Sequence, residues 1–340
     1  MPTKEDLKYF QSMPLDIKVA MTKTRIREWV NHFGESGVYI SFSGGKDSTV
    51  LLHLVRELYP DIPAVFVNTG LEFPEIQQFA KSFDNVTVLY PEKPFYEVLK
   101  TKGYPMISKA IAHNISIARR HPDGNVAKNI VFNENKKSKF CAYKYKDLVN
   151  ADFHLSRQCC DITKKRPVQK YEQSTGRKAI IATMACESAI RESTWLKDGC
   201  NAFDCDRQIS KPMSFWTEQD VLRYAKINGI KLASVYGDII PENAQMNMFE
   251  DYSECKLCTT GADRTGCIFC GFGAHLEKEG EGRFLKLKQT HPKQYNYCIR
   301  GGEYDNDGIW KPNKDGLGMG HVIDVLNELY SKNGKPFIEY

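Results

Sequence analysis

The sequence lacks long hydrophobic runs: no segment approaches the ~20 consecutive apolar residues that a membrane-spanning helix needs. The first ten residues, "MPTKEDLKYF", also lack the apolar core of a secretory signal peptide. We therefore expect a cytoplasmic protein with no membrane partner. Charge of one sign does not dominate either, since 47 Lys and Arg against 42 Asp and Glu give a net charge of +5. Such a balance permits an anionic ligand or a nucleic-acid partner without requiring one.

Cysteine, by contrast, is abundant, with 11 residues in a chain of 340. Without an export signal disulfides are not expected, so clustered cysteines indicate metal or redox chemistry. Six of them form three pairs, one adjacent and two with C-x-x-C spacing: Cys159 and Cys160, Cys255 and Cys258, and Cys267 and Cys270. The two C-x-x-C pairs could together hold one Zn²⁺ ion. Alternatively, the adjacent pair joins Cys267 and Cys270. Because neighbouring thiolates rarely bend onto one atom, this second set favours the separate irons of an iron–sulfur cluster.

The segment "YISFSGGKDSTVLLHLV" predicts a strand, a glycine loop and a helix in that order. Its glycines, Gly44 and Gly45, let the backbone approach an anion, and the first N–H groups of the helix point at it. Lys46 adds a positive charge, and Ser43 and Ser48 add hydroxyl donors. The loop is not a Walker A loop, because Ile40 stands at the first glycine position and Asp47 follows the lysine. It also lacks the G-x-G-x-x-G fingerprint of dinucleotide-binding folds.

The ordered string S-G-G-K-D-S resembles the PP-loop of the ATP pyrophosphatase superfamily, also called adenine nucleotide alpha hydrolases, which includes the phosphoadenosine phosphosulfate (PAPS) reductase family. The resemblance implies ATP as ligand, with Lys46, Asp47 and the backbone of the loop at the pyrophosphate and Mg²⁺ bridging its oxygens. A second segment, "AVFVNTGLEFPEI", is similar to the family's "D-T-G-x-x-F-P-E", with Asn68 at the aspartate position. A third, "ATMACESAIRES", matches a family segment near the nucleotide, with Met184 where an arginine is common. The nucleotide-binding residues that the resemblance implies are Ser41, Ser43, Gly44, Gly45, Lys46, Asp47, Ser48, Asn68, Thr69, Gly70, Glu187, Ser188 and Arg191.

The resemblance also bears on the cysteines. A pair of adjacent cysteines followed by a C-x-x-C pair is similar to the signature of [4Fe–4S] adenosine phosphosulfate reductases. It implies Cys159, Cys160, Cys267 and Cys270 as ligands of a [4Fe–4S] cluster, with Cys258 as a possible replacement for Cys159. The alternative remains Zn²⁺ held with Cys255 and Cys258.

Alternating predicted strands and helices indicate an α/β fold with a doubly wound, mostly parallel sheet. The resemblance implies the Rossmann-like form of the adenine nucleotide alpha hydrolases. We expect an N-terminal helical segment over 1–30, the PP-loop domain over 31–235, and a Cys-rich segment with a helical tail over 236–340. Trp216 is expected in the core, and Thr217 is expected to open a helix that Gly229 closes.

Three functions fit these features. The first is an ATP-dependent sulfurtransferase acting on a nucleic acid, DNA or tRNA, with sulfur from a donor such as a cysteine desulfurase; it resembles DNA phosphorothioation proteins and cluster-dependent tRNA thiolases. The second is a reductase of adenylyl sulfate or phosphoadenylyl sulfate, although no cysteine after Cys298 supplies the nucleophile of those enzymes. The third is a non-catalytic nucleotide- and metal-binding subunit of a modification complex.

Overall fold

The computed structural model describes residues 2–135, 141–242 and 255–340. The chain forms two compact units, and both are discontinuous in sequence. The first unit comprises Met1–Asn68, Glu72–Tyr90 and Pro167–Thr265; the second comprises Thr69–Leu71, Pro91–Arg166 and Gly266–Tyr340. This division cuts across the expected boundaries after residues 30 and 235, because 91–166 groups with the C-terminal part of the chain.

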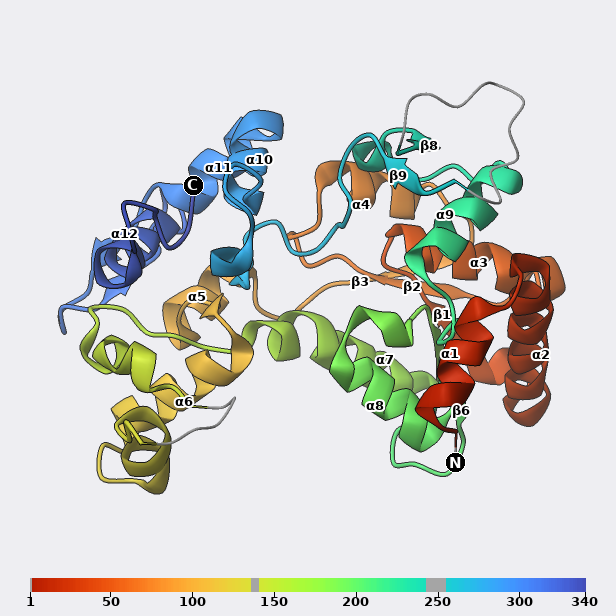
Figure 1. Ribbon diagram of the computed structural model, residues 1–340, viewed down its shortest axis with the longest axis horizontal. Coiled ribbons are helices and arrows are strands. Elements are labelled where there is room, and N and C mark those ends of the chain that lie inside the picture. Colours follow the sequence, from red (N-terminus) through yellow and green to blue (C-terminus); the bar gives the residue numbers. More distant parts are fainter. Residues whose placement is uncertain (1, 136–140, 243–254) are drawn as a thin grey trace. The chain divides into compact units, whose positions relative to one another are not determined.

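The first unit is built on a six-stranded sheet with the order β3-β2-β1-β5-β7-β6 (Figure 1). The strands are β1 (Val38–Ser41), β2 (Ala64–Val67), β3 (Val86–Leu89), β5 (Lys178–Ile181), β6 (Asn201–Ala202) and β7 (Ile209–Ser210). Every neighbouring pair is parallel except β6 with β7. The expected mostly parallel α/β sheet is therefore confirmed. The direction of winding reverses at β1, because β2 lies on one side of it and β5 on the other, and sheets of this kind bind ligands at the carboxyl ends of such strands.

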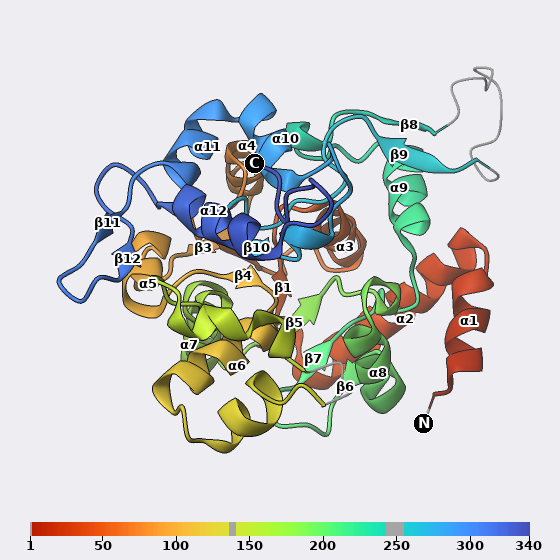
Figure 2. The same cartoon turned by 60° about the vertical axis from the view of Figure 1, so that its left-hand side comes forward.

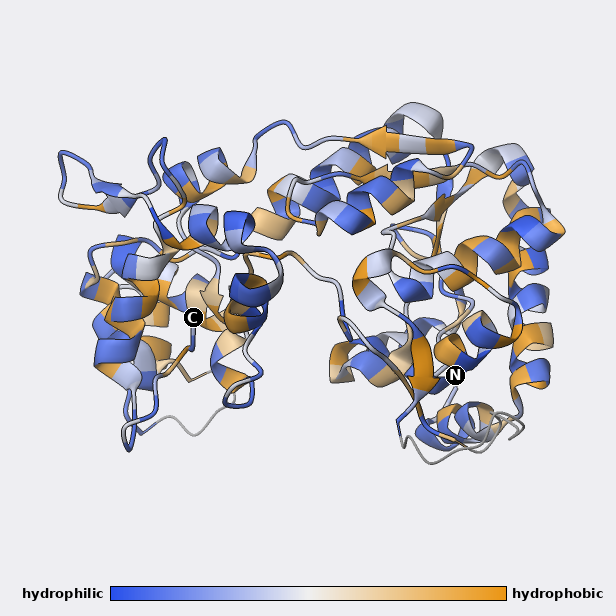
Figure 3. Ribbon diagram, turned by 90° about the horizontal axis from the view of Figure 1, so that it is seen from above, coloured by the Kyte–Doolittle hydropathy of each residue, from blue (hydrophilic) through white to orange (hydrophobic). Residues whose placement is uncertain are grey.

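Helices cover both faces of this sheet, as a parallel sheet requires. They are α1 (Lys4–Ser12), α2 (Leu15–Phe33), α3 (Lys46–Leu58), α4 (Pro74–Lys81), α7 (Arg166–Thr175), α8 (Ala189–Asp198) and α9 (Glu218–Ile227). Successive residues of a strand point to opposite faces. Val38 and Ile40 of β1 accordingly join the core that includes α2 and α3, while Tyr39 lies on the other face against Tyr171 of α7. Figure 3 shows the helices banded blue and orange, the pattern of amphipathic helices with one face on a core.

Two local predictions in this unit are confirmed. The expected helix after Thr217 is α9, and Trp216 lies in the core as expected. The Thr217 hydroxyl accepts the backbone N–H of Asp220, and the Asp220 carboxylate in turn accepts the backbone N–H of Thr217, so the helix begins with a capping box. Trp216 is fully buried, and its indole N–H donates to Thr22 at 2.8 Å. A short hairpin of β8 (Ile239–Pro241) and β9 (Leu257–Thr259) follows α9.

The second unit is mainly helical. Its helices are α5 (Phe95–Lys102), α6 (Lys109–Arg120), α10 (Arg283–Thr290), α11 (Pro292–Ile299) and α12 (Met319–Tyr330). Its strands are β4 (Met106–Ile107), β10 (Gly271–Phe272), β11 (Glu303–Tyr304) and β12 (Trp310–Lys311). The parallel pairing of β4 with β10 joins the two long sequence segments of the unit (Figure 2). At Gly271 a Cβ would overlap the Met106 sulfur and lie 2.9 Å from the Pro105 carbonyl oxygen, so a side chain here would force the paired strands to shift. In the described part of the chain, no helix is both long enough and apolar enough to span a membrane.

Candidate functional site

The predicted glycine loop connects the carboxyl end of β1 to α3, at the strand where the winding reverses (Figure 1). Gly44 has a φ of +71°, and a Cβ there would lie 2.9 Å from the Ile76 Cγ2 atom. A side chain at this position would therefore be strained and would clash. Gly45 is the N-cap of α3 and has no side chain, so it does not itself cap the first N–H groups of the helix.

The serines of the loop bind each other and the loop backbone. The Oγ atoms of Ser43 and Ser48 are 2.9 Å apart, and the Ser48 hydroxyl also lies 2.9 Å from the Gly45 carbonyl oxygen. The backbone N–H of Ser43 donates to the Ser48 hydroxyl at 3.1 Å. Ser48 is buried while Ser43 is exposed. Ser48 thus stabilises the loop from inside, whereas Ser43 is the serine that remains accessible.

Lys46 is only 5% exposed, and both of its donor groups are engaged. Its ammonium nitrogen lies 2.5 Å from the Glu218 carboxylate at the start of α9 and also donates to the Asp263 carbonyl. Its backbone N–H donates to the Tyr236 hydroxyl at 3.1 Å, and that hydroxyl lies 2.6 Å from the Thr265 Oγ1 atom. The sequence indicated neither these three partners of Lys46 nor Thr265, because all four residues lie more than 170 positions from Lys46.

Asp47 lies in the first turn of α3, beside Lys46. One of its carboxylate oxygens, Oδ1, is buried and has no hydrogen-bond partner among the described residues. Burial raises the pKa of Asp47; the Lys46 charge opposes this rise, and the Glu218 charge adds to it. A buried carboxylate oxygen without a donor is uncommon, and here it lies in the helix turn that follows the glycine loop.

The segment after β5 supplies a second group of charges in the same unit. Glu187 forms ion pairs with Arg191, four residues later, and with Arg264 at 3.2 Å. The charges of both arginines oppose the rise in the pKa of Asp47 that burial causes. Ser188 is the N-cap of α8, since its hydroxyl accepts the backbone N–H of Arg191. The structure thus gathers predicted residues from the β1 and β5 ends, and adds Arg264, which the sequence did not indicate.

The three predicted nucleotide-binding residues that follow β2 do not all belong to the same unit. Asn68 is buried in the first unit, and its backbone N–H donates to the Leu89 carbonyl at 2.9 Å. Thr69 and Gly70 belong to the second unit, where the Thr69 hydroxyl accepts the backbone N–H of Leu71. A nucleotide-binding role of these three residues stays a prediction.

The second unit contains all four cysteines of the predicted cluster. The Sγ atoms of Cys159 and Cys160 are 3.9 Å apart, and the backbone N–H of Cys270 donates to the Cys267 carbonyl, which forms a tight turn just before β10. The pKa of Cys159 is raised, first by its contact with Cys160 and by burial, and further by the charges of Cys270 and Cys267. The two pairs therefore lie within electrostatic range of each other although more than 100 residues separate them.

Basic side chains accompany the thiols. The pKa of Cys160 is held well below its ordinary range, chiefly by the Cys159 thiol, with Lys109 and Lys164 contributing. Lys109 is the first residue of α6, directly after β4, and Lys164 follows the cysteine pair by four residues. The Arg283 guanidinium donates to the Cys270 carbonyl at 2.9 Å. Positive charge beside Cys160 thus favours its thiolate, whereas the pKa values of Cys159 and Cys270 are raised, that of Cys270 chiefly by burial.

The alternative cysteines, Cys255 and Cys258, lie in the first unit, at the hairpin of β8 and β9. A zinc site of the two C-x-x-C pairs would join cysteines of different units and stays a prediction. Within the described residues, no group of three or more His, Cys, Asp or Glu side chains is arranged to hold a single metal ion.

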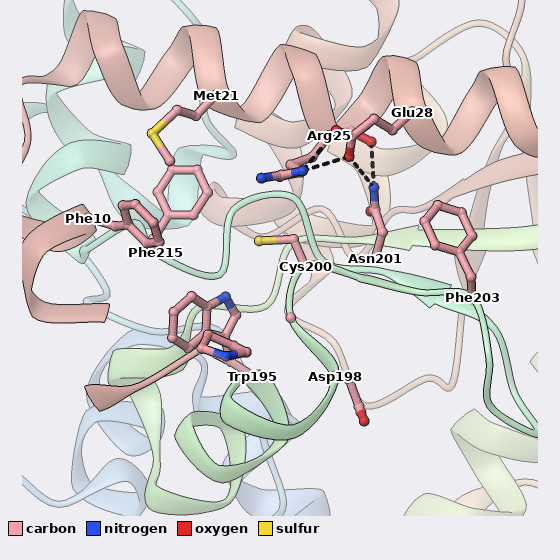
Figure 4. A pocket seen from close by; sticks show the side chains of 12 residues that line it. Phe10, Met21, Arg25, Glu28, Trp195, Asp198, Cys200, Asn201, Phe203 and Phe215 are labelled. Carbon is pink, nitrogen blue, oxygen red and sulfur yellow. Dashed lines mark hydrogen bonds and ion pairs between the residues drawn. The ribbon is translucent and has the colours of Figure 1, made fainter. Parts of the chain in front are cut away.

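A cavity of about 310 Å³ lies in another part of the first unit (Figure 4). Its walls come from the N-terminal helices, the end of α8 and the start of β6, with aromatic side chains of Phe10, Trp195 and Phe215. Arg25 and Glu28 form an ion pair at its edge, 2.8 Å apart. None of the predicted site residues lines this cavity, so it is separate from the glycine loop.

Part of this chain is similar in sequence to known proteins. Residues 37–93 match the family described as the phosphoadenosine phosphosulfate reductase domain. An uncharacterized protein of Methanocaldococcus jannaschii is 25% identical over 283 residues, covering 80% of this chain and 50% of that protein. A phosphoadenosine 5'-phosphosulfate reductase of Xylella fastidiosa is 32% identical over 80 residues, covering 24% of this chain and 32% of the enzyme.

Among solved structures, a phosphoadenylyl-sulfate reductase of Candida auris matches with a TM-score of 0.35 and 12% identity, covering 69% of this chain and 91% of that chain. The chain spans half, or less, of the length of the first curated relatives it matches. Residues 37–93, which contain the glycine loop, are thus similar to the phosphoadenosine phosphosulfate reductase domain, and the resemblance expected from the sequence is confirmed over this stretch.

Proposed function

We propose that this chain is a PP-loop enzyme that uses ATP to adenylate an acceptor and then transfers sulfur to it. In the first step an acceptor oxygen attacks the α-phosphorus, the bond to the β-phosphate breaks, and pyrophosphate leaves. In the second step a sulfur nucleophile displaces AMP from the adenylated acceptor and takes the place of the acceptor oxygen. The observation that carries this proposal is the glycine loop itself, which presents the amino end of α3 and Lys46 at the strand where the sheet reverses.

The residues of the first unit have defined roles in this proposal. The N–H groups at the start of α3 and the Lys46 ammonium stabilise the negative charge that develops on the leaving pyrophosphate. Arg191 and Arg264 supply further positive charge from the segments after β5 and β9. Bound Mg²⁺ would supply charge at the phosphate oxygens, and the unpartnered carboxylate oxygen of Asp47 is of the ligand type that this cation prefers.

The four paired cysteines of the second unit would hold a [4Fe–4S] cluster. This cluster would bind the sulfur atom that is transferred to the acceptor, or pass it on. The donor set supports this, because Cys159, Cys160, Cys267 and Cys270 form two close pairs, and adjacent cysteines suit separate irons better than one ion. The sulfur would come as a persulfide from a donor protein of the cysteine desulfurase type, and a dithiol reductant would then cleave the S–S bond so that one sulfur stays on the acceptor. The chain's own contribution is to keep these thiols together through the pairing of β4 with β10.

For the acceptor we propose a nucleic acid, either tRNA or DNA. Residues 91–166, which belong to the second unit, contain more than twice as many Lys and Arg as Asp and Glu, although the whole chain has a net charge of only +5. Most of the described cations of this segment are exposed, among them Lys109 and Arg157. Such a concentration of positive charge is the usual electrostatic feature of a surface that contacts a phosphate backbone.

A sulfonucleotide reductase is the second candidate, and the family match favours it. Its chemistry needs an accessible thiolate outside the cluster ligands. Cys298, the last cysteine of the sequence, does not qualify, because it is fully buried and burial raises its pKa. An accessory nucleotide-binding subunit remains the third candidate, since Asn68 and Met184 depart from the family pattern.

One set of reactions tests the three candidates. The purified protein, prepared without oxygen, is incubated with ATP, Mg²⁺ and either tRNA or DNA, and pyrophosphate is measured. Acceptor-dependent release supports the sulfurtransferase, sulfite formed from adenylyl sulfate supports the reductase, and neither product supports the accessory subunit. Iron and acid-labile sulfide are measured on the same sample; stoichiometric zinc without iron would refute the cluster.

A further inference from the structure

Lys46 donates hydrogen bonds through its backbone N–H and its ammonium group, and the acceptors of both belong to one neighbouring layer of the first unit. The layer consists of the start of α9, the turn at Tyr236 and the segment that ends at Thr265. Tyr236 is 2% exposed and accepts the Lys46 backbone N–H at 3.1 Å, while Glu218 lies 2.5 Å from the Lys46 ammonium. The Asp263 carbonyl accepts from the same ammonium.

The Tyr236 hydroxyl lies where the loop is closest to this layer. A Cβ placed on Gly45 would be 3.3 Å from the Tyr236 Oη atom and 3.5 Å from the Thr265 Oγ1 atom. The hydroxyl therefore lies close against the amino end of α3. Its second hydrogen bond, 2.6 Å to Thr265, fixes its position.

A phosphate bound at the amino end of a helix uses the same backbone N–H groups. The Lys46 N–H has a single hydrogen and points at the Tyr236 oxygen, so a phosphate oxygen and this hydroxyl compete for it. We infer that Tyr236 is the residue that closes the phosphate-binding end of α3, and that polyphosphate binds by displacing its hydroxyl from the Lys46 N–H. This inference rests on the proposed function. It adds that the Tyr236 hydroxyl lowers the affinity for nucleotide.

Competition predicts the direction of one substitution. Tyr236→Phe keeps the buried ring but removes the hydroxyl, so the Lys46 N–H is released. Affinity for ATP should then rise about 3- to 10-fold, the amount expected when one neutral hydrogen bond no longer has to be broken. A direct phosphate-binding role of the hydroxyl would instead make the same variant bind more weakly.

The experiment measures dissociation constants for ATP and for pyrophosphate by calorimetry on the full chain. Tyr224→Phe is the matched control, since it removes a tyrosine hydroxyl that lies 3.1 Å from His53 in the same unit, away from the loop. We expect tighter binding for Tyr236→Phe, with the control unchanged. Hydrogen exchange at the Lys46 amide should also accelerate in Tyr236→Phe without ligand, while the exchange of the β1 amides stays slow and shows that the fold is intact.

Three results would overturn the inference. Unchanged or weaker binding by Tyr236→Phe, when the wild type binds ATP, refutes competition but leaves the proposed function standing. Equal tightening by Tyr224→Phe would show a general loosening of the unit rather than release of one N–H. If neither the wild type nor the variant binds ATP or pyrophosphate, the proposed function is refuted, and the inferred competition by Tyr236 is refuted with it.

Discussion

The buried ion pair between Lys18 of α2 and Asp220 of α9 allows a quantitative prediction. The ammonium nitrogen lies 2.7 Å from the Asp220 Oδ2 atom, and the two side chains are only 3% and 7% exposed. Lys18→Met keeps most of the side-chain volume but leaves a buried carboxylate without its counter-charge, a change that costs about 3–5 kcal/mol. The Asp220 oxygen still accepts the backbone N–H and the hydroxyl of Thr217, at 2.7 and 2.8 Å. We therefore expect Lys18→Met to lower the free energy of unfolding by about 3 kcal/mol, the lower end of this range.

Urea unfolding followed by tryptophan fluorescence measures this loss. Trp29, Trp195 and Trp216 all lie in the core of the first unit, so the signal reports mainly on that unit. Lys23→Met is the matched control: its partner Glu57 is half exposed, and such surface pairs contribute less than about 1 kcal/mol.

The double variant Lys18→Met with Asp220→Asn decides between a charge effect and lost packing. It should recover part of the stability lost by the single variant, because no charge is left unpaired. If Lys18→Met stays within 1 kcal/mol of the Lys23→Met control, or if the double variant is no more stable than Lys18→Met alone, the argument from buried charge is wrong.

The other predictions concern the candidate sites. Lys46→Met should lower acceptor-dependent pyrophosphate release by about 100-fold or more, as expected for loss of one positioned charge at the leaving group, while the circular dichroism spectrum stays unchanged. Asp47→Asn should stabilise the first unit at neutral pH: the folded-state pKa of Asp47 is raised, so the wild type loses stability as pH rises above the ordinary value of 3.8. Thermal unfolding at pH 3 and at pH 7 should therefore show a gain for the variant only at pH 7, and a gain of equal size at both would contradict the reasoning. Cys160→Ser should reduce the iron and acid-labile sulfide of the anaerobic protein, whereas Cys205→Ser, at an exposed cysteine outside both C-x-x-C pairs, should leave them unchanged.

The sequence predicted those features that local chemistry determines. A β-rich run, two glycines and a helical run are adjacent in the chain, so the strand, loop and helix around Lys46 follow from a few consecutive residues. The capping box at Thr217 is equally local, because its two partners are three residues apart. The parallel sheet could be anticipated from the alternation of such elements, but the short antiparallel β6 could not.

Contacts between residues that are far apart in the chain could not be predicted from the sequence. Tyr236 lies 190 positions from Lys46, and nothing in its neighbourhood predicts that its hydroxyl accepts a loop N–H. The division into units could not be predicted for a related reason. The pairing of β4 with β10 joins residues 91–166 to 266–340, but each strand has only two residues, which is too few to show a periodic pattern. The cysteine pairs were the exception, because the type of side chain indicated a shared site before any contact was known.

The first turn of α9 connects the stability of the first unit to its glycine loop. Asp220 in this turn is held by Lys18 of α2, while Glu218, two residues earlier, holds the ammonium of Lys46. Successive side chains of a helix point in different directions, so one turn can bind the core with one carboxylate and the loop with another. The buried pair fixes the start of α9, and this in turn determines where the Glu218 carboxylate meets Lys46. A polyphosphate that takes the Lys46 ammonium must therefore compete with a carboxylate that the core of the unit keeps in place, whereas the Tyr236 hydroxyl competes for the backbone N–H of the same residue.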